Sequence, residues 1–434
     1  MNKHFPKVLF LTPCAFNKVT GGGITFTNLF DGWPRDRLAT IHNDSIPTTS
    51  EVCNLYYRLT DCELVTFSIL QRYKPKCQNG NAPFQPKKDF DNLIGIFYKA
   101  LIGLKFLIFG DGLPAKGHLT ASLEAWIKEY QPQVLYTIMG SIAFMELAKE
   151  ISSKFNLPIV IHFMDDWPVA IYRGGIISFL QRHKMNYLLR ELTRKSSVRL
   201  AISEAMAVEY TRRYGLNFGS IQNAIDLSKW SGYSRKIVRN IRHVRLAYIG
   251  SILPFAQLQS LVDCCRAVQS ICDEGRSISL EIYTPLFLAG KFIKELQAGD
   301  SIILRDALTD DGEMFKILQE VDIVLLPVNF DQSSIRFIKY SMPTKIPSYL
   351  SACAPILAYG PSEVAQISYA LDAGWAYVVP VRDAKALKSG ILKIINDYSL
   401  RKSLSKKAHK CAIKNHNLVN VKAVFHNYLI NSVN

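Results

Sequence analysis

Short apolar runs alternate with segments of helical periodicity along most of this 434-residue chain. In the first half the pattern predicts strands at residues 7–11, 134–137, 158–163 and 198–202, and helices at 119–130, 143–155, 177–193 and 204–214. In the second half it predicts strands at residues 242–249, 279–283, 301–304, 323–327 and 355–359, and helices at 258–271, 292–298, 312–320 and 345–350. Strands that alternate with helices form βαβ units, so the pattern predicts the α/β class with parallel sheets.

The two halves repeat one plan, and the chain is too long for a single hydrophobic core. We therefore expect two Rossmann-like domains, residues 1–230 and 231–416, joined near residues 226–243. Open parallel sheets bind ligands outside the carboxyl ends of their strands, so a site is expected in the loops that follow the strands. Residues 72–91 follow neither periodicity and are expected to form an exposed loop.

The chain is strongly basic, with 52 lysine and arginine residues against 36 aspartate and glutamate residues and a formal net charge of +16. Such an excess favours a nucleic acid, an acidic membrane surface or an anionic substrate as partner. The sequence lacks helix-turn-helix, zinc-finger and RNA-binding patterns, so we expect no nucleic-acid partner. The nine cysteines are scattered without the spacing of a zinc or redox motif, which favours reduced thiols in the cytoplasm.

Two features make attachment to an anionic membrane surface an expectation. Residues 93–109 are nearly continuous apolar sequence, interrupted by Lys99 and Lys105, and are slightly too short to span a bilayer. A basic cluster follows between Arg173 and Arg199, with Glu191 as the nearby acid. A solvated basic helix would explain the same cluster.

The stretch from Ser341 to Pro361 predicts a tight turn, a helix and a buried strand. Ser341 and Thr344 can cap this helix, and Lys345 lies in its first turn. A helix N-terminus offers unpaired N–H groups and about half a positive charge, so hydroxyls and a lysine there are typical of a phosphate or diphosphate site. An ordinary capped core helix explains these residues equally well.

The order of the motifs resembles that of the GT-B glycosyltransferases, specifically glycosyltransferase family 4, over nearly the whole chain. The segments that carry the resemblance are Gly21-Gly22-Gly23, Ser203-Glu204-Ala205-Met206 with Arg213-Tyr214-Gly215, Gln222-Asn223-Ala224-Ile225-Asp226, Val321 to Pro327, Lys345 to Leu350, Pro355-Ile356-Leu357 and Val419 to Leu429. The resemblance implies two Rossmann-like domains that face each other across a cleft. It also implies that the last helix, about residues 417–434, crosses back onto the N-terminal acceptor domain.

The resemblance further implies a donor diphosphate site and a metal-free reaction, without another cofactor, that retains the anomeric configuration. The donor-binding residues that it implies are Gly22, Gly23, Gly250, Ser251, Ser341, Thr344, Lys345 and Ser348. The chain departs from the family at two places. The positions of the family's two glutamates fall at Tyr340 and Ser348, and its Arg/Lys pair after the first C-terminal strand falls at Ser251 and Ala256.

A polar cluster follows the predicted strand at residues 158–163 and consists of His162, Asp165 and Asp166. A group that orients a hydroxyl or accepts its proton is needed at such a strand end, so we expect these three residues to be catalytic. A core histidine beside two helix-capping aspartates would give the same pattern.

These features predict a cytoplasmic glycosyltransferase, peripheral at the inner face of the membrane, that acts in polysaccharide or glycoconjugate assembly. Its partners would be a nucleotide-sugar donor and a hydroxyl of a saccharide or lipid-linked acceptor. A non-catalytic GT-B scaffold or sugar-binding subunit would explain the departures from the family. A dinucleotide-dependent oxidoreductase is disfavoured, because Gly21-Gly22-Gly23 does not match G-x-G-x-x-G.

Overall fold

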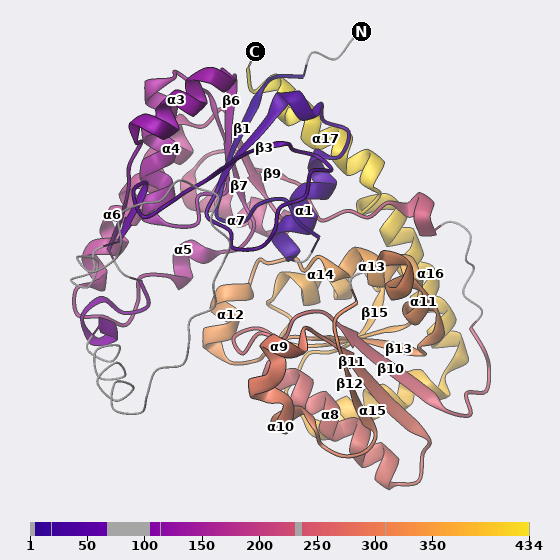
Figure 1. Ribbon diagram of the computed structural model, residues 1–434. Helices are drawn as coiled ribbons and strands as arrows, with labels where there is room; N and C mark the ends of the chain where they lie inside the picture. Colours follow the sequence, from indigo (N-terminus) through magenta and orange to yellow (C-terminus); the bar gives the residue numbers. More distant parts are fainter. Residues whose placement is uncertain are drawn as a thin grey trace. The chain divides into compact units, whose positions relative to one another are not determined.

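The computed structural model describes residues 5–18, 20–66, 105–112, 114–230, 237–308 and 310–433. The chain divides into two compact units, each built around one parallel sheet (Figure 1). The first unit consists of Met1–Ala201, Ala207–Ser220 and Val424–Asn434, and the second of Ile202–Met206 and Ile221–Ala423. The predicted α/β class, with two Rossmann-like domains, is confirmed.

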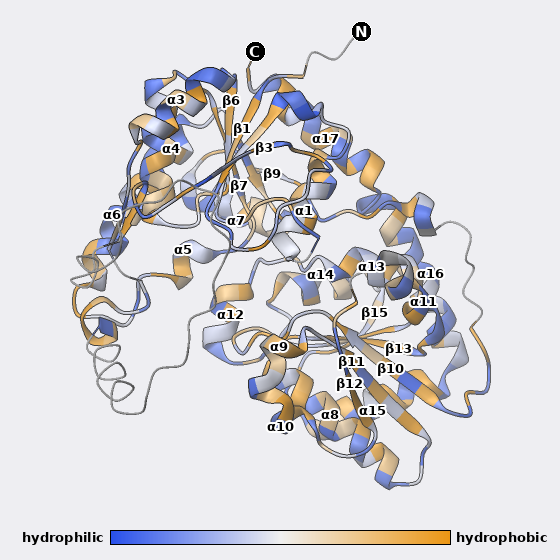
Figure 2. Cartoon of the chain, in the orientation of Figure 1, coloured by the Kyte–Doolittle hydropathy of each residue, from blue (hydrophilic) through white to orange (hydrophobic). Residues whose placement is uncertain are grey.

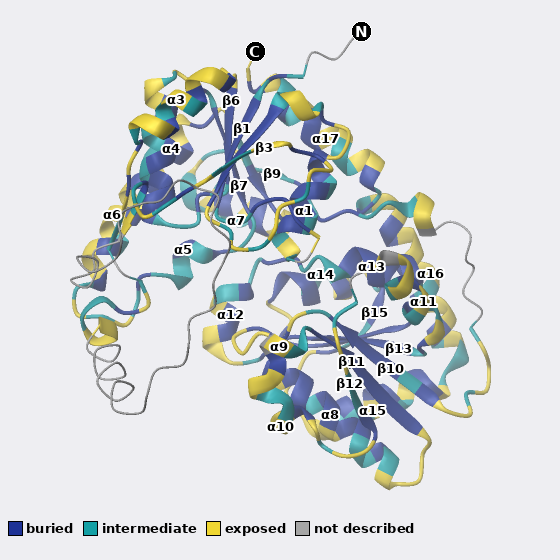
Figure 3. Cartoon of the chain, viewed as in Figure 1, coloured by how far each residue is buried: buried dark blue, intermediate teal, exposed yellow. Residues whose placement is uncertain are grey.

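The sheet of the first unit has seven strands in the order β3-β2-β1-β6-β7-β8-β9, all paired in parallel. The strands are β1 (Val8–Thr12), β2 (Leu38–His42), β3 (Leu55–Arg58), β6 (Val134–Thr137), β7 (Ile159–Phe163), β8 (Val198–Ala201) and β9 (Gly219–Ser220). The inner strands β1, β2, β6 and β7 are buried along their whole length (Figure 3), as expected for a parallel sheet covered on both faces. A separate antiparallel pair is formed by β4 (Leu64–Thr66) and β5 (Ala115–Gly117).

Helices cover this sheet and begin at side-chain caps where the sequence offers a hydroxyl. They are α1 (Gly21–Phe30), α3 (Ala121–Tyr130), α4 (Ile142–Lys154), α5 (Trp167–Ala170), α6 (Ser178–Lys195), α7 (Glu204–Tyr214) and α17 (Leu418–Asn431), with a 3₁₀ turn η1 at Arg35–Arg37. Thr20, Thr120 and Ser141 accept the capping hydrogen bonds of α1, α3 and α4.

The last part of α17 belongs to the first unit, although the chain reaches it from the second. The ring of Phe425 packs at 5.0 Å from Phe30 and at 5.6 Å from Tyr136, measured between centroids. His426 Nε2 lies 3.0 Å from the Leu29 carbonyl oxygen. These contacts join the end of the chain to an aromatic core that also contains Phe10.

The sheet of the second unit has six parallel strands in the order β12-β11-β10-β13-β14-β15. The strands are β10 (Val244–Ile249), β11 (Ile278–Tyr283), β12 (Ile302–Arg305), β13 (Ile323–Pro327), β14 (Ile356–Tyr359) and β15 (Ala376–Val379). The helices are α8 (Leu258–Asp273), α9 (Leu286–Ala289), α10 (Ile293–Leu296), α11 (Asp311–Glu320), α12 (Gln332–Ile338), α13 (Lys345–Ala352), α14 (Ala365–Ala373), α15 (Ala384–Asn396) and α16 (Tyr398–Asn415), with 3₁₀ turns η3 (Leu227–Trp230) and η4 (Gly290–Phe292). Helices α8 and α15 pack on each other and on the sheet, whereas α13 packs against α11 and α16 on the other face (Figure 1). The strands are predominantly hydrophobic and lie between these two helical layers (Figure 2).

The predicted strands and helices are confirmed to within about two residues, and β6, β13 and α7 have the predicted limits. The structure adds β2, β3, β15 and several helices that the pattern did not predict.

Seven described cysteines are free thiols, but Cys62 is disulfide-bonded, so the expectation that every cysteine is reduced is wrong there. The predicted loop at 72–91 and residues 93–104 of the apolar stretch lie outside the described residues. Of the described helices, none combines the length and apolar character needed to cross a bilayer.

Candidate functional site

The amine of Lys345 lies at the carboxyl end of β10 in the second unit. Its Nζ is 2.9 Å from the Tyr248 hydroxyl and 4.0 Å from the centre of the Tyr248 ring. A Cβ placed on Gly250 would lie 3.2 Å from this amine, so the lysine fills the space over the first residue after the strand. Gly250 also has a φ of +134°, which an L side chain rarely adopts. A glycine at this position therefore satisfies both the backbone and the close approach of Lys345.

The electrostatic environment of Lys345 is unusual for a lysine on this basic chain. The residue is half-buried, and none of the carboxylates in the described ranges forms an ion pair with it. Burial lowers the pKa of its amine to about 7. A protonated amine has three hydrogen-bond donors and Tyr248 accepts one of them, so an anion could accept the others. By contrast, Lys339 lies 3.8 Å from the Glu363 carboxylate.

The turn before α13 is held from both sides by hydrogen bonds to its backbone. Ser203 Oγ donates to the carbonyl of Tyr340 at 2.8 Å, and the Asn223 amide donates to the carbonyl of Met342 at 2.7 Å. Both donors come from segments of the family resemblance, and both belong to the second unit. They fix the carbonyls on either side of Ser341 and so determine where α13 begins.

A pair of hydrogen bonds fixes α13 against β10. The Tyr349 hydroxyl donates to the carbonyl of Ile249 at 3.0 Å and accepts from the backbone N–H of Ile249 at 2.9 Å. The Tyr248 hydroxyl donates to the Ser251 carbonyl at 2.6 Å, which leaves its lone pairs for the Lys345 amine. The end of β10 and the start of α13 are therefore one connected unit.

The structure corrects the predicted cap of α13. Thr344 occupies the N-cap position, but its backbone is helical and its side chain makes no capping hydrogen bond. The Ile346 N–H donates instead to the Pro343 carbonyl at 3.2 Å, and Pro347 has no N–H. The backbone group of this first turn that an anion could accept from is therefore the Lys345 N–H. Ser341 lies buried on the preceding turn, Ser348 is buried one turn further along α13, and Ser251 is exposed after Gly250.

Two residues of this site, Tyr248 and Tyr349, escaped the sequence analysis, as did Asn329 elsewhere in the second unit. Asn329 is fully buried two residues after β13 and joins the loop that follows β13 to the loop that follows β10. Its amide donates to the Pro254 carbonyl at 2.8 Å, and its oxygen accepts from the backbone N–H of Ser260 at 3.2 Å. A polar residue directly after the apolar run of β13 was the available signal.

The glycines of the first unit have a packing role at the start of α1. A Cβ on Gly22 would lie 2.8 Å from the Cys14 sulfur, and a Cβ on Gly23 would lie 2.4 Å from the Asn17 side chain. The Thr20 hydroxyl accepts from the Gly23 N–H at 3.2 Å. Gly22 and Gly23 thus allow α1 to begin against the loop after β1, and the first N–H groups of α1 have no partner within the helix.

His162 does not lie in a polar loop as we expected. It is a fully buried residue of β7, with its Nδ1 2.7 Å from the Tyr136 hydroxyl. Its Nε2 has no hydrogen-bond partner among the described residues. Burial lowers its pKa to about 3, so the imidazole is neutral at physiological pH. The geometry matches the alternative interpretation, a core histidine.

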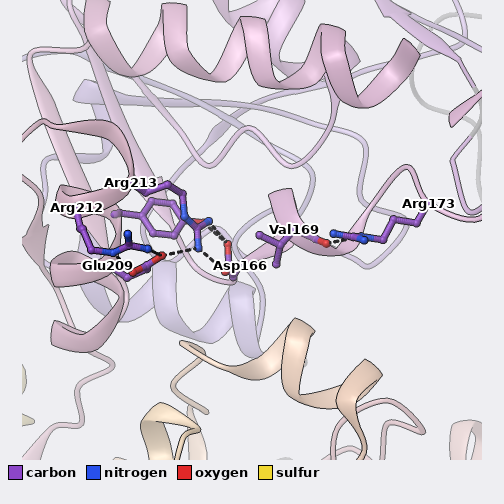
Figure 4. A network of polar contacts seen from close by, with 7 residues as sticks. Asp166, Val169, Arg173, Glu209, Arg212 and Arg213 are labelled. Carbon is purple, nitrogen blue, oxygen red and sulfur yellow. Dashed lines mark hydrogen bonds and ion pairs between the residues drawn. The ribbon is translucent and has the colours of Figure 1, made fainter. Parts of the chain in front are cut away.

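Asp166 is enclosed by a polar network that belongs to the first unit (Figure 4). Its two oxygens accept from Arg213 Nη1 and Nη2 at 2.8 and 3.0 Å, and the Tyr210 hydroxyl donates to it at 2.7 Å. Burial opposes charge on Arg213, but the Asp166 carboxylate raises the pKa of the guanidinium above its usual value. Glu209 joins at 3.3 Å from Arg213. A carboxylate that accepts three hydrogen bonds in this way holds α7 to the loop after β7.

Asp165 is the member of the predicted cluster that lies in the open loop after β7. It is half-buried. Burial raises the pKa of the Cys14 thiol to about 11, and the charges of Asp44 and Asp165 add to this effect. Asp165 is therefore near Cys14, which packs against Gly22. The loop after β7, the loop after β1 and the start of α1 meet here. The described residues contain no group of three His, Cys, Asp or Glu side chains that could hold a metal ion.

Known structures share the fold of the chain over nearly its full length. Neither a family model nor a curated protein matches the sequence. Sucrose-phosphate synthase from Thermosynechococcus elongatus has a TM-score of 0.62 at 12% identity, covering 96% of this chain and 97% of that one. HepE of Anabaena, in complex with UDP-glucose, has a TM-score of 0.60 at 13% identity, covering 97% of this chain and 98% of that one. Trehalose-6-phosphate synthase OtsA has a TM-score of 0.62 at 9% identity, covering 98% of each chain. The chain therefore has the GT-B fold, and identities this low establish the fold alone.

Replacing Asp166 with Asn should destabilise the first unit, because it removes the two-oxygen carboxylate partner of the Arg213 guanidinium and leaves it the longer contact with Glu209 at 3.3 Å. A broken buried ion pair costs about 3–5 kcal/mol, and we expect roughly 3 here because the Arg213 side chain is 24% exposed. Urea unfolding measures the difference. The matched control is Arg212→Gln, whose side chain is 74% exposed and should change stability by less than about 1 kcal/mol. Equal stability of the two variants would remove the structural role of Asp166.

Acidification should destabilise the protein through its buried histidines. Burial lowers the pKa of His162 to about 3 and those of His42 and His416 to about 4, whereas an unfolded chain titrates near 6.5. Between these values the unfolded chain binds more protons, so the stabilisation is complete above pH ~6.5 and is lost as the pH falls toward the folded values. Each histidine should contribute a loss of about 2 kcal/mol between pH 6.5 and pH 5.

The measurement is the pH dependence of urea unfolding in His162→Gln and in the control His409→Gln, whose side chain is exposed. His162→Gln should reduce the pH-dependent loss of unfolding free energy by the contribution of one histidine, and the control variant should leave that loss unchanged. An unchanged dependence in His162→Gln would show that His162 is not held neutral by burial.

Proposed function

We propose that the protein is a glycosyltransferase that moves a sugar from a nucleotide-sugar donor to a hydroxyl of a saccharide or lipid-linked acceptor. The observation that carries this proposal is the Lys345 amine, which lies at a strand end of a GT-B fold and has no carboxylate partner among the described residues. Expulsion of a nucleoside diphosphate needs positive charge where negative charge develops. HepE, one of the proteins with the same fold, has been crystallised with UDP and with UDP-glucose, which supports a nucleotide sugar as the donor.

The residues around Lys345 in the second unit each have a role in this proposal. Lys345 would neutralise the leaving diphosphate with its amine, and its own backbone N–H in the first turn of α13 would donate to the same ligand. Tyr248 would direct the lysine, while Ser203 and Asn223 would fix the turn that carries it. Lys345 thus supplies from α13 the charge that related enzymes place after the first C-terminal strand. We propose that the reaction retains the anomeric configuration and needs no metal.

In the first unit we propose Asp165 as the group that orients the acceptor hydroxyl. It is the half-buried carboxylate of the predicted trio, in a loop that adjoins Cys14 and Gly22. His162 would support it from β7, and Asp166 would support it from the next position of the loop, where Arg213 and Tyr210 of α7 hold it. A non-catalytic GT-B subunit remains the second candidate, because Ser348 occupies the position of the donor-binding glutamate and is buried. Transfer or hydrolysis of a donor separates the two, since a scaffold shows neither.

Uridine or guanosine diphosphate should raise the melting temperature without a divalent metal, and Lys345→Ala should weaken that effect. A charge-assisted hydrogen bond to phosphate contributes about 1.5–3 kcal/mol, so nucleotide affinity should fall roughly 10- to 100-fold. Calorimetric titration measures the affinity, and Lys402→Ala, an exposed lysine of α16, is the control for lost charge. A nucleotide shift that disappears with EDTA, or equal affinity in Lys345→Ala and wild type, would contradict the proposed donor site.

We also propose that the first unit docks on an anionic membrane, as a peripheral protein of the cytoplasmic face. Five large side chains form what we call the apolar patch. They are Phe106, Leu107, Ile176, Phe179 and Leu180, exposed by 54, 56, 68, 63 and 56%. The N–H of Ile176 donates to the Leu107 carbonyl at 2.9 Å, so the two segments are adjacent. Exposed cations of α6, among them Arg190, Arg194 and Lys195, would attract acidic headgroups.

The protein should bind vesicles that contain phosphatidylglycerol more tightly than neutral vesicles, and added salt should weaken this binding. The double variant Phe179→Ser/Leu180→Ser removes apolar area and should reduce the bound fraction in a flotation assay. Its control is Val208→Ser/Leu371→Ser, at exposed apolar positions on other helices. Equal binding to neutral and anionic vesicles, or equal loss in both variants, would exclude the apolar patch as the docking surface.

A further inference from the structure

The second unit contains a basic hollow that takes no part in the proposed transfer reaction. Its volume is about 530 Å³, and side chains of α8, the end of β14 and the start of α15 line it. The charged residues of this lining are Asp263, Arg266, Arg382, Lys385 and Lys388. Helices α8 and α15 pack on one face of the sheet, whereas α13, which carries Lys345, packs on the other with α11 and α16 (Figure 1). The hollow and the Lys345 site are therefore separate.

The acid of the lining is already neutralised. Asp263 Oδ2 accepts from Arg382 Nε at 3.0 Å and from the Tyr359 hydroxyl at 3.2 Å. Tyr359 is only 1% exposed, so this carboxylate and its partners form a fixed floor. The arginine retains further N–H donors, because the guanidinium has five and Asp263 takes one.

The cations outnumber the acid, and two of them have no ion pair. Lys388 donates to Ser270 Oγ at 3.0 Å and pairs with Glu274, which is not part of the lining. Arg266 and Lys385 form no salt bridge with any carboxylate of the described residues. Asp383, the nearest acid in sequence, caps α15 by accepting from the Ala386 N–H. The hollow thus combines four cations with one neutralised acid.

We propose that this hollow binds a small phosphorylated metabolite, with the phosphate between Arg266, Arg382 and Lys385. Guanidinium groups match the geometry of phosphate oxygens, and lysine adds a point charge. The volume is in the range of small-molecule sites, and a concave shape suits a discrete molecule better than a nucleic-acid strand. Ala384 is a small, exposed residue of the lining. This assignment does not depend on the glycosyltransferase proposal.

The test is calorimetric titration with inorganic pyrophosphate in the Lys345→Ala background, so that a phosphate site at α13 does not contribute. Arg266→Gln/Lys385→Gln should bind pyrophosphate at least tenfold more weakly than the Lys345→Ala parent. The matched control Lys406→Gln/Lys410→Gln removes the same charge from exposed positions of α16 and should bind like the parent. Ala384→Trp keeps every charge but fills part of the hollow and should also weaken binding.

Each outcome decides the proposal. Tenfold loss in the Arg266/Lys385 and Ala384 variants, with the control unchanged, supports a defined site in the hollow. Equal loss in the control would show a general charge effect and overturn the proposal, as would parent-like binding in the Arg266/Lys385 variant. Retained binding in Ala384→Trp would place the anion on the open surface and overturn the hollow as the site. Nucleotide binding by the Lys345→Ala variant tests the site on the other face of the sheet. Failure of the donor-site proposal and failure of the hollow proposal can therefore be distinguished.

Discussion

The second unit is organised around one enclosed lysine amine at the end of a β-strand. An ammonium removed from water is unfavourable unless an anion or hydrogen bonds compensate it, and here the described residues supply a tyrosine hydroxyl and an aromatic face in place of a carboxylate. The surroundings of Lys345 are correspondingly fixed. Gly250 has no side chain in the path of the amine, and Tyr349 joins α13 to β10 through both backbone groups of Ile249. A site arranged in this way is prepared for a negatively charged ligand.

In the first unit, by contrast, the buried polar groups of the predicted trio have partners within the unit. Asp166 is held by Arg213 and Tyr210, and His162 lies against Tyr136 beside the aromatic core. These groups stabilise the sheet and α7, whereas Asp165 lies half-buried in the loop after β7. The residue types that suggested catalysis in the sequence thus divide into two supporting residues and one half-buried carboxylate.

The sequence was sufficient for the fold, because the fold depends on local signals, and the same signals made Lys345 a candidate donor-site residue. Apolar runs identified β6 and β13 to the residue, and the turn before α13 marked a helix start. Side-chain partners were not predictable in the same way. Thr344 has a capping side chain but a helical backbone, so it leaves the helix uncapped. Tyr248 and Lys345 are 97 residues apart, and the pairing of Asp166 with Arg213 spans 47. Periodicity along the chain carries no information about such contacts. Strands β2 and β3 also escaped prediction, because short runs such as these compete with loop patterns.

The most direct test of this account is the titration of the Lys345 amine itself, followed by NMR of protein labelled at lysine side chains and assigned with Lys345→Ala. The account predicts a pKa near 7 in the free protein, as burial dictates, and a rise of more than one unit when uridine diphosphate is bound, because an anion favours the protonated amine. A pKa near the ordinary lysine value of about 10.4 in the free protein would contradict the enclosed amine. A lowered pKa that the nucleotide leaves unchanged would contradict its role as the diphosphate partner.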